Sequence, residues 1–210
     1  MSVDHAIHEV PEEKKVVKHE FDFDKMYHVK SRGNRYTITP MCSWTPGPYV
    51  ESFMHEGDLR NIWWEVQNGD VVIDVGAGYG SYTLSALAAG ATIVIAFEPG
   101  RNEFFDLCNN LLVNDFMLKC MPINALAGNL IGVVDGYYPA SHSSVPEGYS
   151  EYRCMISIDF IVNMCGLDKL NWIKIDTEGF ELPVVQGGLE SIKKFHPRLI
   201  VENHVAINPN

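Results

Sequence analysis

Three carboxylates follow an apolar run late in the chain. In "WIKIDTEGFELPVVQGG" (172–188), Asp176, Glu178 and Glu181 come directly after Trp172 and its apolar neighbours. Such acids either begin the next helix, where negative charge suits the helix dipole, or face a site whose chemistry needs carboxylates. We expect Glu181 to begin the helix. We expect Asp176 and Glu178 to face a ligand, because ligands bind at the carboxyl ends of parallel strands.

A glycine-rich turn ends an earlier apolar run. The run closes in "DVGAGYGS", which places Asp74, Gly76, Gly78 and Gly80 in a DxGxGxG pattern. Glycines let the backbone turn sharply and let a ligand approach the main chain, and free N–H groups at the next helix favour an anionic group. Glu98 closes the following run, where a carboxylate can accept hydrogen bonds from ribose hydroxyls. Either the turn only joins a strand to a helix, or these residues bind a ribose-bearing ligand.

The elements that would position these residues alternate in type. Short, nearly all apolar runs are separated by segments with helical spacing. This alternation is typical of a parallel sheet covered by helices on both faces. We therefore predict a Rossmann-like, doubly wound α/β fold with a mostly parallel sheet. The expected strands are 71–75, 92–97, 119–124, 172–176 and 198–203, and the expected helices are 81–90, 101–114 and 183–195.

The first part of the chain lacks this pattern. Residues 1–35 are rich in Glu, Lys, His and Asp, and we expect a solvated arm or helical cap there rather than core. With the proline-rich loop that follows, the arm covers residues 1–50, and the main domain covers 51–210. At its start, residues 51–66 suit a helix with Trp63 in the core.

Residues 129–156 also break the alternation. They are rich in Pro, Gly, Ser and Tyr, and we expect a long functional loop or lid rather than strands or helices. Its aromatic side chains would line a pocket or pack in the core: Tyr137, Tyr138 and Tyr149.

Composition narrows the class of protein. The 210 residues carry 16 basic and 27 acidic side chains, a formal net charge of −11. That charge disfavours nucleic acid and anionic membrane surfaces as partners. Five scattered cysteines without metal spacing, and an N-terminus unlike a signal peptide, predict a cytoplasmic protein. The oligomeric state is left open, with a homo-oligomer among the alternatives.

The order of these motifs resembles the class I S-adenosylmethionine-dependent methyltransferases. Over about residues 70–204, "VVIDVGAGYGSYTL", "AFEP", "SIDFIV", "IKIDTEGFE" and "HPRLIVEN" together resemble the FkbM family of that class. Known members mostly methylate hydroxyl groups of sugars or natural products. A sheet of this class usually continues after its fifth strand with further strands. The chain stops six residues beyond His204, so we expect those last strands to be missing.

The resemblance implies which residues bind S-adenosylmethionine. The glycine turn would hold the methionine half of the donor, Glu98 the ribose, and the end of the third strand the adenine. Asp176 would hydrogen-bond the donor's amino group. The implied set is Asp74, Gly76, Ala77, Gly78, Tyr79, Gly80, Glu98, Asn124, Ala125 and Asp176.

Methylation of a hydroxyl also needs a group that removes its proton. The candidates are Asp176, Glu178 and His204. Glu178 would need a raised pKa, which burial beside Asp176 could provide. With Asp159 these three could gather a divalent metal ion, but no ligand spacing supports it, and we predict no metal site.

Two other functions remain open at this stage. One is a structural or regulatory protein that binds S-adenosylmethionine without catalysis, although the acids at positions 176 and 178 count against it. The other is a nicotinamide-dependent oxidoreductase, against which Ser81 stands where its fingerprint has a glycine. The favoured function is methyl transfer to a hydroxyl of a small-molecule acceptor, such as a carbohydrate.

Overall fold

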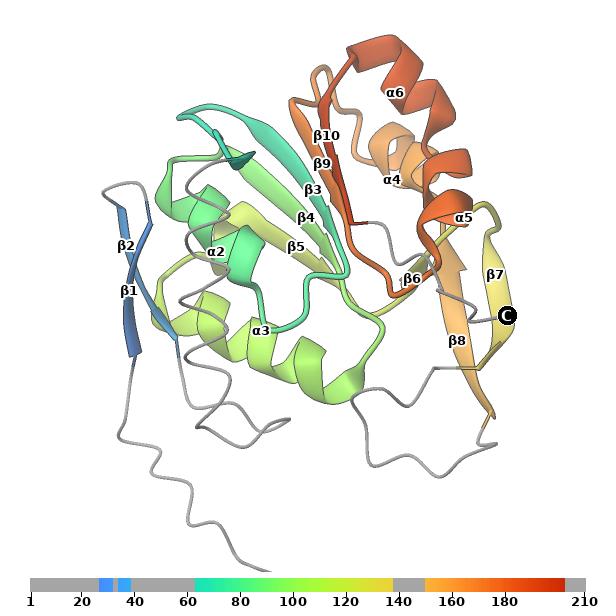
Figure 1. Ribbon diagram of the computed structural model, residues 1–210, viewed down its shortest axis with the longest axis horizontal. Helices are drawn as coiled ribbons and strands as arrows, with labels where there is room; N and C mark the ends of the chain where they lie inside the picture. Colours follow the sequence, from blue (N-terminus) through green and yellow to red (C-terminus); the bar gives the residue numbers. More distant parts are fainter. Residues whose placement is uncertain (1–26, 32–33, 39–62, 138–149, 203–210) are drawn as a thin grey trace, which may run out of the picture.

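The computed structural model describes residues 27–31, 34–38, 63–137 and 150–202. Its centre is a five-stranded sheet in which every neighbouring pair is parallel (Figure 1). The strand order is β10-β9-β3-β4-β5, so the first strand of the series lies in the middle and the chain winds outward in both directions. The predicted doubly wound, mostly parallel sheet is confirmed. Its strands are β3 (Val71–Val75), β4 (Ile93–Phe97), β5 (Cys120–Ile123), β9 (Trp172–Ile175) and β10 (Arg198–Val201).

Helices cover both faces of this sheet (Figure 1). Because side chains alternate along a strand, Val72 of β3 joins one core and Ile73 the other. The first core contains residues of α2 (Ser81–Ala88) and α3 (Arg101–Val113). The second contains residues of α4 (Ile158–Met164) and α5 (Glu181–Gln186), with α6 (Leu189–Phe195) packed beside them.

A single helix over 183–195 is wrong, because the chain forms α5 and α6 with a break at Gly187 and Gly188. A side chain on Gly187 would overlap the backbone carbonyl of Gly128. The break therefore lies where another part of the backbone packs directly against the helix. Two adjacent glycines also weaken a helix by about 1 kcal/mol each relative to alanine.

The expected loop over 129–156 contains two strands. β7 (Gly132–Tyr137) pairs antiparallel with β8 (Ser150–Ile156), and β8 pairs with β6 (Leu126–Ala127) in a small second sheet. The loop prediction is therefore wrong for these residues. Tyr138 and Tyr149, expected to line a pocket, lie outside the described residues, and so does the side chain of Tyr137.

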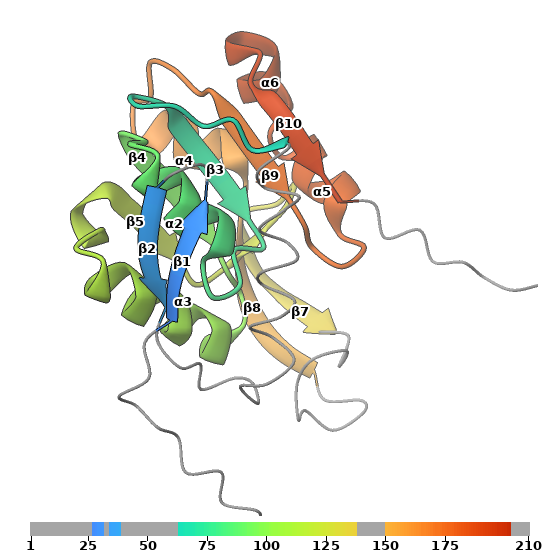
Figure 2. The same ribbon diagram turned by 60° about the vertical axis from the view of Figure 1, so that its left-hand side comes forward.

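The predicted arm also contains structure. β1 (Tyr27–Ser31) and β2 (Asn34–Ile38) form a hairpin that lies beside α2 and α3 (Figures 1 and 2). Tyr36 and Ile38 are buried in the first core, and the Asn114 side chain hydrogen-bonds both the N–H and the carbonyl of Thr37. This part of 1–50 is thus packed against the main fold, while the boundary at residue 50 stays a prediction.

Of two adjacent tryptophans, the structure buries Trp64 and not Trp63, which was predicted to lie in the core. Trp63 is 64% exposed, whereas Trp64 is buried and contacts Tyr82 and Trp172 edge-on. The expected burial of Trp63 is wrong by one position. A short 3₁₀ turn, η1 (Met117–Lys119), leads into β5. Within the described residues, no helix is both long and apolar enough to cross a bilayer.

Candidate functional site

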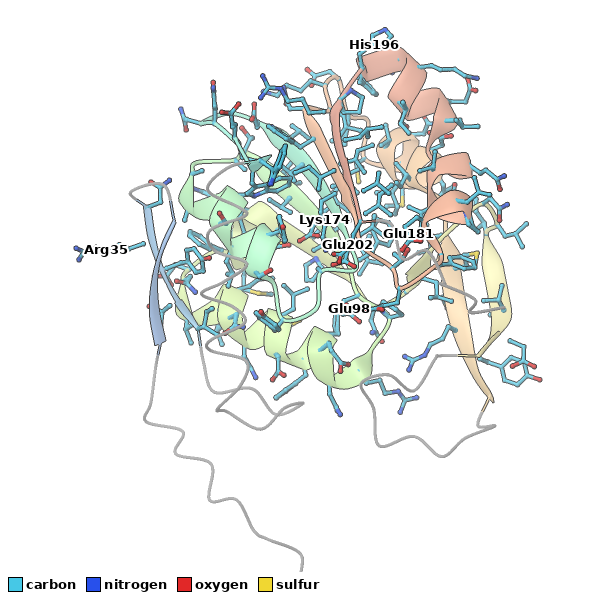
Figure 3. The ribbon with its side chains drawn as sticks, viewed as in Figure 1. Arg35, Glu98, Lys174, Glu181, His196 and Glu202 are labelled. Carbon is cyan, nitrogen blue, oxygen red and sulfur yellow. The ribbon has the colours of Figure 1, made fainter. Side chains whose placement is uncertain are left out.

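Acidic residues gather at the carboxyl end of the central sheet. Asp74 belongs to β3, Glu98 follows β4, Asp176 follows β9 and Glu202 follows β10. Figure 3 shows Glu98, Lys174 and Glu202 at this end of the strands, whereas His196 lies at the opposite end. Parallel strands bring the ends of elements far apart in the sequence to one edge. The edge therefore combines several carboxylates in one place.

The glycine turn joins three of these strand ends. The N–H groups of Gly76 and Ala77 both donate to the carbonyl of Phe97, at 3.0 and 2.9 Å, which ties the turn to β4. Gly76 has a φ of +73°, and a Cβ there would overlap the carbonyl oxygen of Asp176. A glycine is thus required where the ends of β3 and β9 touch.

Gly78, at the tip of the turn, is in a different position. Its φ is +55°, but a Cβ built on it would meet nothing within 4 Å among the described residues. As far as the structure describes its surroundings, this side of Gly78 has room for a group that approaches the main chain. The turn then closes at Gly80, which precedes α2 and packs against Leu107, while the carbonyl of Tyr79 accepts a hydrogen bond from Asn110.

Glu98 is buried between the turn and the next helix. Its carboxylate accepts hydrogen bonds from the N–H groups of Gly78 and Gly100, both at 2.7 Å. Burial raises the pKa of Glu98 to about 7, although the same two N–H groups act in the opposite direction. A carboxylate has about four acceptor positions, so these two bonds leave capacity for a ligand hydroxyl.

Lys174 is the principal site residue that sequence reasoning missed. It lies in β9 directly opposite Asp74 in the register, and both side chains are buried on the same face of the sheet. Its ammonium lies 3.5 Å from Asp74 Oδ1 and 3.3 Å from Asp176 Oδ2, and it donates to the carbonyl of Gly76 at 2.7 Å. The only sequence signal was a lone charge inside the apolar run "WIKI".

The charge state of Lys174 follows from its neighbours. Burial alone would lower the pKa of Lys174, but the carboxylates of Asp74 and Asp176 outweigh burial and raise it above its usual value. The lysine therefore stays protonated at neutral pH. Asp74 completes the cluster by accepting a hydrogen bond from the Thr83 hydroxyl at 2.7 Å.

The acids after β9 separate into different roles. Asp176 is partly open, with 28% of its side chain exposed, and its N–H donates to Val75. Glu178 is exposed and has a φ of +54°, so the expected burial beside Asp176 is wrong. Glu181 begins α5, as predicted, and its carboxylate accepts hydrogen bonds from the N–H groups of Thr177 and Gly179.

The residues after β5 face the loop that follows β4. The amide group of Asn124 donates to the carbonyls of Glu98 and Pro99, at 2.8 and 3.2 Å. Arg153 of β8 donates to the same Pro99 carbonyl, which ties the small sheet to this edge. Ala125 is buried. Asn124 thus lies beside Glu98, with its donor nitrogen engaged by the backbone.

The side chains considered above as metal ligands do not come together as far as the structure describes them. Asp159 accepts hydrogen bonds from the N–H groups of Glu190 and Ser191 at the start of α6. His204 lies outside the described residues. Among those that are described, no three His, Cys, Asp or Glu side chains are grouped as a metal site would require.

Comparisons with known proteins identify the family. The sequence matches the methyltransferase FkbM domain over residues 74–209. The hexuronic acid methyltransferase AglP of Haloferax volcanii is 26% identical over 157 residues, which are 72% of this chain and 63% of that protein. The crystal structure of methyltransferase FkbM from Methylobacillus flagellatus KT is similar with a TM-score of 0.50 at 22% identity, covering 65% of this chain and 33% of that one.

These comparisons agree with the fold and the motifs. The structural similarity supports the Rossmann-like architecture, and the chain spans less than two thirds of the length of either relative. The family match begins at Asp74, near the end of β3, and includes the glycine turn, Glu98 and the acids after β9. Since this match covers more than half of the sequence, the chain belongs to the FkbM family of methyltransferases.

Proposed function

We propose that this protein transfers a methyl group from S-adenosylmethionine to a hydroxyl of a small, sugar-like or natural-product acceptor. The observation that carries this proposal is the contact between the glycine turn and Glu98. Gly78 offers an open main chain, and the buried Glu98 carboxyl beside it has acceptor capacity left for ribose hydroxyls. Family membership supplies the reaction class.

The other residues of the edge fit such a donor in different ways. The partly exposed Asp176 carboxylate could accept a hydrogen bond from its amino group, and the turn 76–80 with Ala77 and Tyr79 would lie along its methionine half. Asn124 and Ala125 are proposed beside the adenine. Asp74 is buried and engaged by Thr83 and Lys174, so we assign it to support of the turn rather than to contact.

The donor and the protein have different roles in methyl transfer. The bound donor supplies a methyl group already activated by its positive sulfur, so the protein must align the acceptor and remove the hydroxyl proton. Asp176 is held by Lys174 and suits binding better than proton removal. Glu178 is exposed two residues further on, and we propose it or His204 as the base.

The proposed acceptor class rests on the relative with a stated substrate. AglP is named a hexuronic acid methyltransferase and is 26% identical to this chain. A hexuronic acid offers both hydroxyls and a carboxylate. Methylation of a hydroxyl yields an ether that mild alkali leaves intact, whereas methylation of the carboxylate yields an ester that alkali removes.

The test combines donor binding with product chemistry. Calorimetry with S-adenosylmethionine and S-adenosylhomocysteine should show binding to the wild-type chain, and incubation with hexuronic acids and neutral sugars should yield an alkali-stable methylated product. Absence of donor binding would overturn the proposal. Binding without turnover on any acceptor would favour the non-catalytic alternative, and an alkali-labile product would replace hydroxyl by carboxylate methylation.

Variants of the edge sharpen this test. We expect Glu98→Gln to weaken donor binding by about tenfold or more, since each lost charged hydrogen bond is equivalent to about 1.5–3 kcal/mol. Asp176→Asn and Glu178→Gln should leave the fold intact and lower turnover. Glu190→Gln is the matched control, because Glu190 is an exposed acid of α6 that pairs with Lys193 of the same helix, also exposed. Wild-type turnover in both acid variants would remove Asp176 and Glu178 from the mechanism.

A further inference from the structure

Lys174 lies where a parallel sheet would normally have an apolar side chain. Its neighbours on the same face of β3 and β4 include Val72 and Ala96, which are fully buried. A buried ion pair is weak evidence for stability, because desolvation of both charges offsets their attraction, and apolar residues of similar volume often replace such pairs without loss. The fold alone therefore does not account for the lysine.

The contacts of Lys174 join two separate segments. Through Asp74 and the carbonyl of Gly76 it holds the end of β3 and the start of the glycine turn. Through Asp176 it holds the end of β9. The ammonium also lies 5.1 Å from the centre of the Tyr82 ring, which covers it from α2. The lysine thus fixes where the Asp176 carboxylate lies relative to the turn.

The charges of the cluster do not cancel. One aspartate is enough to neutralise one lysine, and Asp74 lies directly opposite Lys174. Among the described residues, Asp74 Oδ1 accepts no hydrogen bond. The second carboxylate leaves one net negative charge, and it belongs to Asp176, the most exposed of the three groups. Among the described residues, the side chains of Lys174 and Asp74 are 5% and 0% exposed, so of the three groups it is Asp176 that a ligand can reach.

We propose that Lys174 is a positioning residue, whose ammonium holds the Asp176 carboxylate against the glycine turn in the orientation that receives the cationic amino group of the methyl donor. This inference rests on the proposed function, since it needs that donor. It assigns no proton transfer to Lys174, which stays protonated at neutral pH. Its action is on affinity for the donor, through Asp176.

The experiment must separate the role of Lys174 in binding from its role as the counter-charge of the buried Asp74. Lys174→Met alone would leave the buried Asp74 carboxylate without its counter-charge and destabilise the fold, whatever the role of the lysine. We therefore use the full chain with Asp74→Asn as the reference and add Lys174→Met to it. Urea unfolding measures stability, and calorimetry measures the affinity for S-adenosylhomocysteine, which carries the same amino group. If the Met variant does not fold, Lys174→Gln in the same reference keeps a donor for the Gly76 carbonyl.

The expected result is a loss of affinity without a matching loss of stability. In the Asp74→Asn reference, Lys174→Met should weaken binding by about tenfold or more, equivalent to about 1.4 kcal/mol. Asp176→Asn should weaken the affinity for S-adenosylhomocysteine similarly. The losses of the two changes together should be clearly less than additive, because each change disrupts the same pairing of Lys174 with Asp176. Lys169→Met is the matched control, since Lys169 donates to the carbonyl of Gly69 at the other end of β3.

Two outcomes would overturn the proposal, and they are distinguishable from failure of the proposed function. Unchanged affinity after Lys174→Met in the reference would make the lysine only a counter-charge for Asp74. Full additivity with Asp176→Asn would show that it acts independently of that acid. If the wild-type chain itself binds no S-adenosylhomocysteine, the proposed function fails, and the assignment of Lys174 fails with it.

Discussion

Both ends of the strand pair β3 and β9 carry a lysine, an aspartate and a left-handed glycine, but in different surroundings. At the amino end, the exposed Lys169 donates to Gly69, and the half-buried Asp70 accepts hydrogen bonds from Gln67 and from the Trp172 indole at 3.1 Å. These bonds close a turn at the surface. The bonds from Lys169 and Gln67 are exposed, so water can replace them at modest cost.

At the carboxyl end the same residue types are buried. Lys174 donates to Gly76 and pairs with Asp74, and neither side chain reaches solvent appreciably. Charges in such a place are retained against a desolvation cost. The difference indicates that the amino end is arranged for folding, whereas the carboxyl end keeps charge that folding alone does not require.

The largest expected contrast is in the stability loss on replacing Gly76 at the carboxyl end and Gly69 at the amino end by alanine. Gly76→Ala should lower the free energy of unfolding by at least about 4 kcal/mol, because the new Cβ would overlap the Asp176 carbonyl and the ends of β3 and β9 must separate. Gly69→Ala is the matched change. Gly69 has a φ of +93° with nothing within 4 Å of a built Cβ, so only backbone strain of about 1–2 kcal/mol is expected.

Urea unfolding of both alanine variants measures this contrast. The result should show the fold losing several times more stability at position 76 than at position 69. Equal losses would mean that the carboxyl end relaxes around the new side chain, and the close packing of the turn against Asp176 would then not be a constraint on the site.

The second contrast concerns pH. Because the pKa of Glu98 is raised from 4.5 to about 7 by burial, the folded chain holds this proton more tightly than the unfolded chain. The resulting stabilisation is fully present below about pH 4.5 and is lost as the pH rises through about 7. Asp70, the half-buried acid at the amino end, lacks such burial.

Glu98→Gln isolates this effect from all other titrations. Relative to the variant, the wild type should lose about 2–3 kcal/mol of unfolding free energy between about pH 5 and about pH 8. Urea unfolding at both pH values provides the measurement. A constant difference between the two proteins would contradict the raised pKa, and with it the buried state of the carboxyl group next to the turn.

The sequence predicted the carboxyl end only in part. Runs such as 71–75 identify their strands because burial on both faces leaves mostly apolar side chains, with Asp74 as the exception, and the position of Glu98 follows from the strand order. Lys174 could not be assigned in that way. Its partner Asp74 is far away in the chain, and the pair becomes visible only when the register of β3 and β9 is known.

Other errors also come from contacts between distant segments. The break between α5 and α6 reflects the approach of Gly187 to Gly128, which no local propensity reports, although the glycine pair was visible. β7 and β8 were missed because they carry exposed side chains, such as Val133 and Tyr152. Their sequences therefore do not form the continuous apolar run of a strand that is buried on both faces. Trp64 is buried instead of Trp63 because neighbouring side chains point in different directions. A sequence pattern that is misread by one residue therefore selects the wrong side chain for the core.

The smallest expected effect belongs to the amino end. Asp70→Ala removes the acceptor for the Gln67 N–H and for the indole N–H of the buried Trp172. Each of these two bonds contributes about 0.5–1.5 kcal/mol, so we expect a loss of about 1–3 kcal/mol in urea unfolding. Affinity for S-adenosylhomocysteine should stay at the wild-type value.

A loss of stability with unchanged ligand affinity would show that the amino end of the strand pair contributes to the fold and not to ligand binding. Trp172 packs against Trp64 and begins the strand that also carries Lys174, so a disturbance could in principle travel along β9 to the carboxyl end. β9 is bonded in register to β3 and β10 on both sides, however, and a parallel ladder of this kind resists a shift of one strand. A loss of ligand affinity in Asp70→Ala beyond the loss of stability would show that the strand does move. The amino end would then belong to the functional site rather than only to the fold.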